Sequence, residues 1–549
     1  MKLKFLFSLL LGSALTVAAE GYVDGVEYFR ADQPEEAEII LNNTLNQPET
    51  DKAVAYYYLG QIALQKGDKA TAKKMFDAGM AANPENGYNY VGLGTLALRD
   101  GDAKTAEKYF KDAKKFAKKD FDILTEIPRA YFQANPVAYT KEIEKWLADI
   151  KKQAKNTAPA PFILEGDILA GAKNVGESAG MYEMAATFDH ESKNAKDAHP
   201  EAYVKYARVI FQVNQKAALD KLRELLGYQP ESALVQRELA EKLYDANQLT
   251  NAAKQYEAYI QNPNSFQKDK QRLAGLLFFA KRYPESYKLA SDILAQDPGN
   301  FYMERMQFYN LKAMGDTVPA VQAAEKLIAN PGAQLNSHDF TEYAELLGDM
   351  GNDSLACVMY ENAVKVDPEK TSLLKDLSGA YNRATRFQDA ADTMQKYVDL
   401  QGAEADPNDL LALALRYNAL SASQQAVQDE NWKANSDKAL TTITKVREVI
   451  PDHPLVLNNY TRILMTNKNG EIDQAVAEAD LATLAALDSD PDNLESRKAI
   501  YVQVLGRLGN YYVTNHDIDN ARKMFERFYQ IQPSPELKAY LETLAPKAE

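Results

Sequence analysis

Gly176-Glu177-Ser178-Ala179-Gly180 fits the G-x-S-x-G pattern that carries the nucleophilic serine of many hydrolases. In that pattern the serine stands on a strained turn between a strand and a helix, with a histidine as its base. Here the preceding letters, FILEGDILAGAKN, have a helical pattern, and the candidate bases His190 and His199 have no sheet to carry them. We therefore expect Ser178 to be a small packing residue of a helix, and a serine hydrolase is the third-ranked hypothesis.

Histidines and acidic residues lack the spacing of a metal site. The five histidines lie scattered at positions 190, 199, 338, 453 and 516, whereas a zinc site without cysteine pairs needs a closer grouping. The acidic segment that begins at Asp488 resembles a calcium loop, but positions six and twelve, which need Gly and Glu, are Asn493 and Ala499. No glycine-rich nucleotide-binding motif is present. We expect no metal and no cofactor.

The balance of charge excludes one class of partner. The 549-residue chain has a formal net charge of −15, and nucleic-acid binding needs a clustered positive surface. Its 46% apolar residues are enough for a folded core. One basic segment, Lys111 to Lys119, could meet an anionic lipid or glycan, although a solvated helix face is the favoured interpretation.

The first residues have the pattern of a secretory signal peptide. Lys2 and Lys4 precede an apolar stretch from Phe5 to Val17, and Val17-Ala18-Ala19 forms a small-residue cleavage site. We expect residues 1–19 to be removed and the protein to be exported, to the periplasm or another extracytoplasmic place. No other run has the length of a membrane span, so membrane contact would be at most peripheral. The single cysteine, Cys357, is expected to be a buried hydrophobe.

An internal sequence repeat indicates the helices that carry these residues. The strings Tyr56–Phe76 and Tyr90–Phe110 begin 34 residues apart and share eleven of twenty-one letters. This period predicts a helix, a turn, a second helix and a linking turn. Gly67 and Asp68 suit the turn and the start of the next helix. Gly60 lets the two helices approach closely, and Phe76 is expected to fill the gap between one hairpin and the next.

These letters resemble the tetratricopeptide repeat family, and copies in the same register recur along most of the chain. The resemblance implies an all-α protein, a right-handed α-solenoid of tetratricopeptide-type helical hairpins. The expected organisation is a signal peptide (1–19), a degenerate first unit (20–52), two strong repeats (53–120), divergent hairpins (121–200), a repeat array (201–402), irregular hairpins with insertions (403–501), a strong repeat (502–535) and a capping helix (536–549).

Two stretches leave the hairpin geometry open. Residues 121–160 keep helical periodicity but lack the Gly and Ala signature, and residues 408–495 contain an enlarged turn and a second helix that looks too long. Longer helices or extended loops are expected there.

The resemblance also implies a function. In this family the exposed positions of the first helices line a concave face that binds extended peptides or partner helices. The positions that correspond here are Tyr57, Gln61, Tyr88, Arg99, Arg237, Tyr244, Arg305, Tyr309, Lys375 and Arg383. The leading hypothesis is a non-catalytic scaffold or adaptor that binds another envelope protein or peptide segment. A glycan- or lipid-binding module is the alternative, and the sequence names neither the partner nor the oligomeric state.

Overall fold

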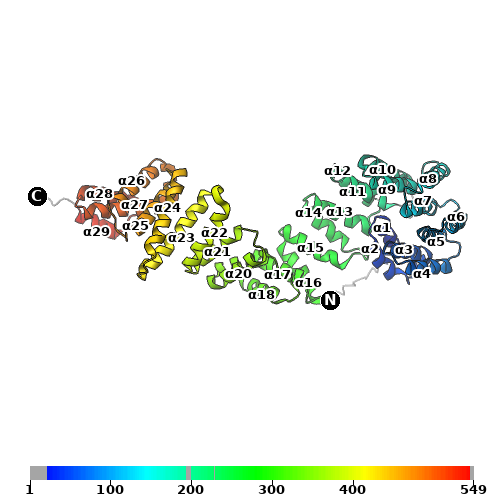
Figure 1. Cartoon of the computed structure of the whole chain (residues 1–549), viewed down its shortest axis with the longest axis horizontal. Helices are drawn as coiled ribbons and strands as arrows, with labels where there is room; N and C mark the ends of the chain where they lie inside the picture. The colour runs from blue at the N-terminus through cyan, green and yellow to red at the C-terminus, as the bar shows by residue number, and fades with distance from the viewer. Residues whose placement is uncertain (1–20, 193–198, 228, 545–549) are drawn as a thin grey trace, which may run out of the picture. The chain divides into compact units, whose positions relative to one another are not determined.

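A computed structural model gives the fold of residues 21–192, 199–227 and 229–544. The predicted signal peptide, residues 1–19, lies outside the described residues. Within the described part every regular element is a helix, and consecutive helices pair into antiparallel hairpins (Figure 1). The predicted fold class, an all-α stack of helical hairpins, is confirmed.

The chain divides into two compact units, Met1–Pro298 (unit 1) and Gly299–Glu549 (unit 2). The division falls inside the predicted 201–402 array. The hairpins of unit 1 are α1–α2 (Gly21–Arg30, Pro34–Thr44), α3–α4 (Lys52–Gln65, Lys69–Ala82), α5–α6 (Gly87–Arg99, Ala103–Ala117), α7–α8 (Phe121–Ala134, Thr140–Gln153), α9–α10 (Pro159–Gly171, Val175–Ser192), α11–α12 (Pro200–Ile210, Gln215–Leu226), α13–α14 (Ala233–Asp245, Leu249–Tyr259) and α15–α16 (Gln267–Phe279, Tyr283–Gln296).

Unit 2 continues the same plan and ends on a single helix. Its elements are α17–α18 (Phe301–Met314, Thr317–Ala329), α19–α20 (Ser337–Asp349, Asp353–Val366), α21–α22 (Ser372–Arg383, Phe387–Gln401), α23–α24 (Pro407–Ala426, Trp432–Val449), α25–α26 (Pro454–Asn467, Gln474–Asp488), α27–α28 (Leu494–Thr514, Ile518–Ile531) and α29 (Pro535–Thr543), with 3-10 turns η2 (Gly402–Glu404) and η3 (Pro491–Asn493). In both units the odd-numbered helices are the first helices of the hairpins, and several successive ones contact one another, such as α5 with α7 in unit 1 and α23 with α25 in unit 2. We call the surface they share the first-helix face of that unit.

The turn inside a hairpin has the chemistry that its letters predict. Gly67 adopts a φ of +81°, in the left-handed region that glycine enters without steric cost. Asp68 then accepts a hydrogen bond of 2.9 Å from the backbone N–H of Thr71, which caps the start of α4. The turn therefore reverses the chain and starts the second helix within three residues.

The helices of neighbouring hairpins pack closely because glycines leave room for an aromatic ring between them. A Cβ atom on Gly60 would lie 2.3 Å from Phe76, and one on Gly92 of the next hairpin would lie 2.4 Å from the same ring. Phe76 therefore fills the gap between two hairpins, as predicted. The same device occurs inside the stretch predicted to be divergent, where a Cβ on Gly166 would meet Tyr182 at 2.4 Å.

The irregular region of unit 2 differs from ordinary hairpins in helix length. Helices α23 and α24 have 20 and 18 residues and are joined by residues 427–431 alone, so the insertion lengthens helices rather than the turn. Helix α26 has an ordinary 15 residues, and the expectation of an overlong second helix there is wrong. The long element is instead α27, whose 21 residues begin at Leu494 and cross the predicted boundary at residue 501.

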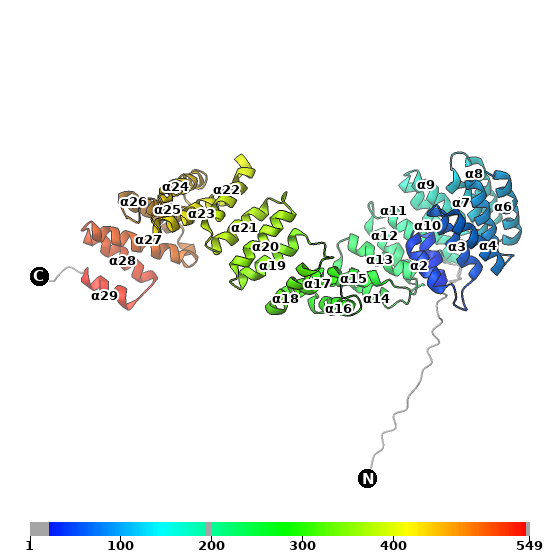
Figure 2. The ribbon, with the colours of Figure 1, turned by 60° about the horizontal axis from the view of Figure 1, so that its bottom comes forward.

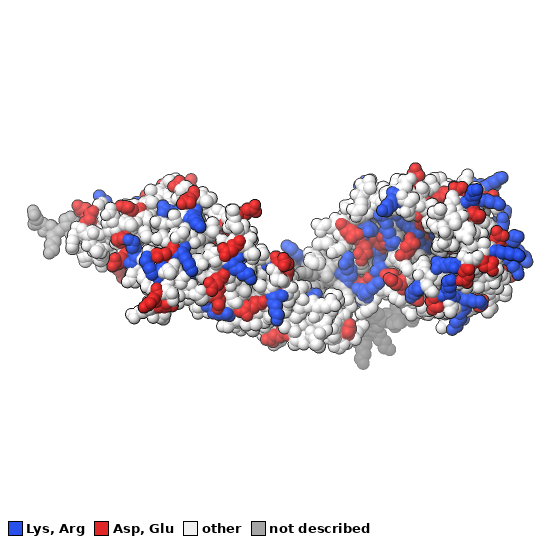
Figure 3. All heavy atoms as spheres, in the orientation of Figure 1, with Lys and Arg blue, Asp and Glu red and all other residues white. Residues whose placement is uncertain are grey.

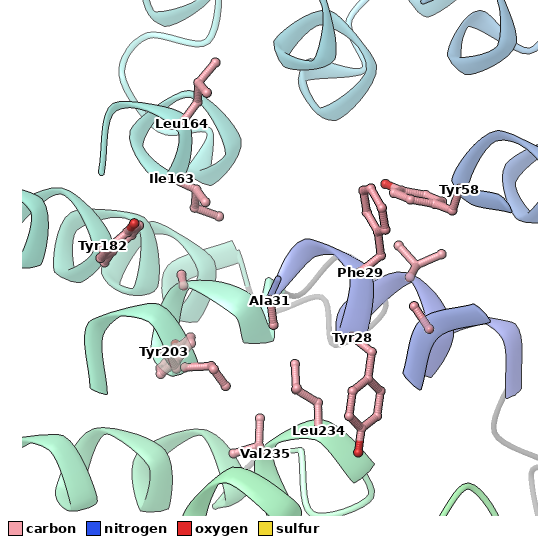
Figure 4. Packing of buried hydrophobic residues seen from close by; sticks show 14 of the residues in the cluster. Tyr28, Phe29, Ala31, Tyr58, Ile163, Leu164, Tyr182, Tyr203, Leu234 and Val235 are labelled. Carbon is pink, nitrogen blue, oxygen red and sulfur yellow. The ribbon is translucent and has the colours of Figure 1, made fainter. Parts of the chain in front are cut away.

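The predicted degenerate first unit, residues 20–52, forms hairpin α1–α2, and α1 packs among first helices that are distant in the sequence. It contacts α3, α11 and α13 (Figures 1 and 2). Phe29 meets the ring of Tyr58 on α3 with centroids 5.3 Å apart, while Tyr28 points toward Leu234 on α13 (Figure 4). Unit 1 therefore packs its first hairpin into a core that it shares with residues about 200 positions later. No helix in the described part combines the length and apolar character needed to cross a membrane.

Candidate functional site: the first-helix faces

Three of the candidate residues in unit 1 are buried, which corrects the expectation that they are exposed. Tyr57 is inaccessible to solvent: its ring packs against Tyr58 and Tyr88, and its hydroxyl donates a 2.9 Å hydrogen bond to Glu126 Oε2. Gln61 and Tyr88 are also buried. The expectation is wrong because other parts of unit 1 cover this part of the first-helix face.

The remaining candidates of unit 1 have internal partners. Arg99 Nη1 donates to the carbonyl oxygen of Leu64 at 2.6 Å, and this bond ties α5 to the end of α3. The half-buried Tyr244 has the guanidinium of Arg272 4.1 Å above its ring centre. These contacts belong to the packing of neighbouring hairpins.

Arg237 joins α13 to two other elements. Its Nε donates to Asp269 at 2.9 Å, and its Nη1 donates to Gln33 of the first hairpin at 2.9 Å. Glu36, on α2, lies 3.4 Å from the same Nη1 and accepts from Lys268 at 2.7 Å. The charges of α13 and α15 thus hold hairpin α1–α2 in place.

The first hairpin has further polar contacts across unit 1. Arg208 Nη1 donates to the carbonyl oxygen of Ala31 at 2.6 Å, and the hydroxyl of Ser232 donates to Glu27 at 2.9 Å. Arg30 donates to the hydroxyls of Tyr58 at 2.8 Å and Tyr88 at 3.0 Å. Hairpin α1–α2 thus engages two of the candidate side chains of unit 1, Tyr88 through Arg30 and Arg237 through Gln33.

A network of buried charges lies where α1, α7, α9 and α11 meet. Asp122 is held between Arg30, at 3.1 Å, and His199 Nε2, at 3.0 Å. His199 Nδ1 lies 3.1 Å from Asp189, so its ring is placed between two carboxylates. Burial alone would lower the pKa of His199, but the two carboxylates outweigh it and raise that pKa well above 6.5. Burial acts upward on the pKa of Asp122, yet His199 and Arg30 hold it well below its usual value.

The same network continues through Asp167. This carboxylate accepts from Arg129 at 2.6 Å and from Lys205 at 2.7 Å, and Lys205 also reaches Asp32 at 3.1 Å. The free space beside Arg30, Asp122, Arg129 and His199 is about 20 Å³, enough for one water molecule. The network is therefore a packed polar core and offers no room for a ligand.

In unit 2, Arg305 and Tyr309 meet on one carboxylate. Arg305 makes a two-pronged contact with Asp339, at 2.6 and 2.7 Å, and the Tyr309 hydroxyl donates to the same side chain at 2.8 Å. Tyr309 is buried. The expectation of an exposed binding tyrosine is wrong here too, because α19 supplies a buried acceptor that α17 satisfies.

Lys375 and Arg383, both on α21, remain exposed. Lys375 is paired with Asp409 at 2.5 Å. Arg383 uses Nε to contact Asp353 at 3.0 Å, and its two Nη atoms extend over the backbone of α19 and α21. A Cβ atom on Gly348 would lie 3.2 Å from Arg383 Nη2.

Sequence reasoning missed Arg416, on α23. Its Nε donates to the Ser378 hydroxyl at 3.3 Å. A Cβ atom on Gly379 would lie 3.8 Å from Arg383 Nη1 and 4.0 Å from Arg416 Nη2, so the two guanidinium groups converge over Gly379. Burial and the charge of Arg383 lower the pKa of Arg416. Its position 33 residues after Arg383, close to the repeat period, was the signal available in the sequence.

Ser178 lies where the packing interpretation predicts. It is fully buried in the first turn of α10, and its hydroxyl donates to the carbonyl oxygen of Val175 at 3.0 Å. Helix α9 precedes it, so the strand that a nucleophile elbow needs is missing from this place. The side chain of His190 lies outside the described part, and His199 is engaged by Asp122 and Asp189.

Two other expectations concern metal binding and the cysteine. Over the described ranges, no group of three or more His, Cys, Asp and Glu side chains is arranged to hold a metal ion. Cys357 is buried, as predicted, and burial raises the pKa of its thiol.

Comparison with protein families identifies the repeat. The model described as tetratricopeptide repeat matches residues 47–121 and 216–265. These stretches include hairpins α3–α4, α5–α6 and α13–α14. Residues 47–121 and 216–265 therefore match the tetratricopeptide repeat, as the sequence pattern predicts. No curated protein matches it.

Several solved structures are similar to the chain. The C-terminal part of a TPR repeat-containing protein from Cytophaga hutchinsonii is 18% identical with a TM-score of 0.40, and the match covers 49% of this chain and 98% of that one. Naa15/Naa10 bound to HypK-THB is 13% identical with a TM-score of 0.30, and the match covers 95% of this chain and 96% of that one. The human IFIT1 dimer with PPP-AAAA is 14% identical with a TM-score of 0.29, and the match covers 93% of this chain and 95% of that one.

Proposed function

We propose that the protein is an exported, non-catalytic scaffold of a bacterial cell envelope that binds a segment of a partner protein on the first-helix face of unit 2. Stacked helical hairpins form extended surfaces suited to such segments, and repeats of this type generally serve as protein-binding scaffolds.

One contrast between the units carries this proposal. In unit 1 the candidate side chains of the first-helix face are engaged by other residues of the unit, as the bonds of Arg237 to Gln33 and of Tyr57 to Glu126 illustrate. In unit 2 the exposed Arg383 and the half-buried Arg416 keep guanidinium groups over glycine backbone. Arginine is among the residue types that most often dominate binding energy.

Export is supported by the N-terminal letters. A basic start, an apolar stretch from Phe5 to Val17 and a small-residue site before Glu20 are what a signal peptidase requires. Fractionation followed by intact mass measurement tests this proposal: a mature chain that begins at Glu20 outside the cytoplasm is expected. A cytoplasmic chain that retains Met1 would contradict it.

Crosslinking mass spectrometry in intact cells tests the binding function. Reproducible crosslinks between the first helices of unit 2 and one other envelope protein are expected. Crosslinks confined to the second helices, or none to unit 2 at all, would overturn the proposal.

A cleft in unit 1 favours a second candidate function, the binding of an anionic glycan or lipid headgroup. Helices α6, α7 and α8 line an open cleft of about 520 Å³, and the ammonium of Lys114 lies 5.1 Å from the Trp146 ring centre. The charged residues of its lining are Lys111, Lys114, Lys141 and Lys145 together with Glu107, Glu142 and Asp149. Residues 103–155 contain twelve Lys and one Arg against eight Asp and Glu. Lys and Arg gather over this end of unit 1 (Figure 3).

Vesicles and charged oligosaccharides test this second candidate. The chain is expected to sediment with phosphatidylglycerol vesicles, or to bind a uronic-acid oligosaccharide, and to do so less after Lys111→Gln with Lys145→Gln. Lys396→Gln, on the exposed surface of α22, is the matched control. Binding that falls equally in the control variant would contradict a site in this cleft.

A further inference from the structure

The two guanidinium groups over Gly379 are held so that their terminal nitrogens face the same space. Arg383 is anchored through Nε by Asp353, and Arg416 is anchored through Nε by Ser378. One terminal nitrogen of each arginine, Arg383 Nη1 and Arg416 Nη2, lies within 4.0 Å of where a Cβ on Gly379 would stand, while Arg383 Nη2 lies beside Gly348. Arginine side chains fixed in this way present preorganised donors rather than freely moving charges.

Within the part of the chain that the structure describes, Arg416 lacks a countercharge. Considering residues 21–192, 199–227 and 229–544, no ion pair within 4.0 Å involves Arg416, and its one hydrogen-bond partner is the neutral Ser378 hydroxyl. A half-buried cation beside a second cation costs free energy through desolvation and like-charge repulsion. An anion between the two groups would remove both costs.

Among the described residues, neither Glu345 nor Asp376 makes an ion pair within 4.0 Å with Arg383 or Arg416. Glu345 pairs with Lys312 at 2.7 Å. Asp376, two turns before Arg383 on α21, is exposed as a residue. Its carboxyl is nevertheless partly buried, and this burial together with the charge of Glu345 raises its pKa. Within the described residues Asp353 is the one carboxylate at ion-pair distance from Arg383, and it contacts Nε rather than the Nη1 atom that lies near Gly379.

The glycine backbone leaves space for a ligand. A Cβ on Gly379 would have ordinary contacts of 3.8 and 4.0 Å with the two guanidinium groups, so the position is open rather than crowded. On Gly348 a Cβ would lie 3.2 Å from Arg383 Nη2, a tighter contact that the guanidinium could relieve with a shift of a few tenths of an ångström. Any longer side chain at position 379 would occupy the space between the arginines.

We propose that Arg383 and Arg416 form a binding site for a carboxylate side chain of an acidic partner segment laid across α19, α21 and α23. Guanidinium groups bind carboxylates through paired, charge-assisted hydrogen bonds, which give direction as well as affinity. The site rests on the proposed scaffold function and gives the partner a chemistry, an Asp- or Glu-rich segment. Since the chain itself has a net charge of −15, such a segment would be repelled by most of its surface and held at this place.

The test uses the full mature chain and a fluorescein-labelled hexaglutamate peptide with an amidated C-terminus, followed by fluorescence anisotropy at low ionic strength. Hexaglutamine is the neutral comparison peptide. We expect binding of hexaglutamate alone, about tenfold weaker binding after Arg416→Gln or Arg383→Gln, and none detectable after both. Arg522→Gln on α28, which removes an exposed arginine paired with Glu526, should leave binding within about twofold.

A second variant keeps the test independent of folding defects. Gly379→Leu retains both arginines and is expected to block the peptide, whereas Gly379→Ala, whose Cβ has room, should bind nearly as well as the unaltered chain. Removal of the uncompensated Arg416 charge should leave the melting temperature unchanged or raised. A lower melting temperature together with unaltered peptide binding would mean that Arg416 is a packing residue and would overturn the site.

Other outcomes contradict the site in distinguishable ways. Equal binding of hexaglutamine, or equal loss in Arg522→Gln, excludes a local carboxylate site. Inorganic phosphate that displaces the peptide at lower concentration than free glutamate would assign the site to phosphate instead. If cellular crosslinks to unit 2 persist after both arginine substitutions, the acidic-segment site is wrong while the scaffold function stands; if no crosslinks exist in the unaltered chain, the scaffold function itself is wrong.

Discussion

His199 is the residue at which the charge network of unit 1 can be tested most sharply. Its ring lies 3.0 Å from Asp122 and 3.1 Å from Asp189, and these carboxylates raise its pKa well above 6.5 despite burial. A histidine whose pKa is raised in the folded state stabilises that state fully below pH ~6.5, and this stabilisation is lost as the pH rises through the folded-state pKa.

We expect His199→Gln to lower the free energy of unfolding by about 2 kcal/mol at pH 6, because it leaves buried carboxylates without one of their partners. The difference from the unaltered chain should shrink as the pH rises toward 9. Urea unfolding across this range measures it, and His338→Gln, at a mostly exposed site in unit 2, is the control. A difference that stays constant with pH would contradict a charged His199.

The residue scale also shows where sequence reasoning stops. Periodicity placed Tyr57 and Tyr88 on first helices, and both do lie there. Their burial could not be inferred, since it depends on Arg30 and Glu126, which the repeat pattern does not connect to them. Ser178 and Cys357 were predictable because their surroundings are local helix packing.

At the scale of elements, the turns inside hairpins repeat a left-handed residue, which costs free energy where that residue is not glycine. Gly351 takes this left-handed position with a φ of +75°, and the equivalent turn between α21 and α22 places Thr385 there with a φ of +58°. A β-branched residue is strained in that region by roughly 1–2 kcal/mol, whereas glycine is not.

Thr385→Gly is therefore expected to raise the free energy of unfolding by about 1 kcal/mol, after the entropy cost of glycine in the unfolded chain. Gly351→Ala is the opposite control: its Cβ would meet no atom within 4 Å, so a loss of about 1 kcal/mol would come from the backbone alone. Denaturant titration of both variants measures these changes. If Thr385→Gly were destabilising, the turn would not be strained as described.

Hairpin α1–α2 is the element whose placement the sequence did not reveal. Arg237 connects it to α13 and to the buried Asp269. Arg237→Ala should cost about 3 kcal/mol, because it removes one partner of a buried charge pair, and should raise hydrogen exchange across residues 21–44. Arg272→Ala, which removes a more exposed arginine next to it, should leave that exchange unchanged. Unaltered exchange in Arg237→Ala would contradict its role in holding the hairpin.

For the whole molecule, the repeat letters were sufficient to predict the class of fold, since Gly60, Gly67 and Phe76 act within one hairpin and its neighbour. They could not separate the two units, because the same letters occur in both. Most candidate side chains have internal partners in both units, such as Arg237 in unit 1 and Arg305 and Lys375 in unit 2. Unit 2 differs in the pair Arg383 and Arg416, which place one guanidinium nitrogen each near the backbone of Gly379.

The most direct test of the proposed docking face is site-specific photo-crosslinking in intact cells. A benzophenone amino acid in place of Asp376 lies on the exposed stripe of α21 that also carries Gly379 and Arg383. The same group in place of Val358, exposed on the second helix α20, is the matched control. We expect one reproducible protein adduct from position 376, mapped to an acidic segment of the partner, and none from position 358. An adduct from 358 alone, or none from 376, would contradict a partner on the first-helix face of unit 2.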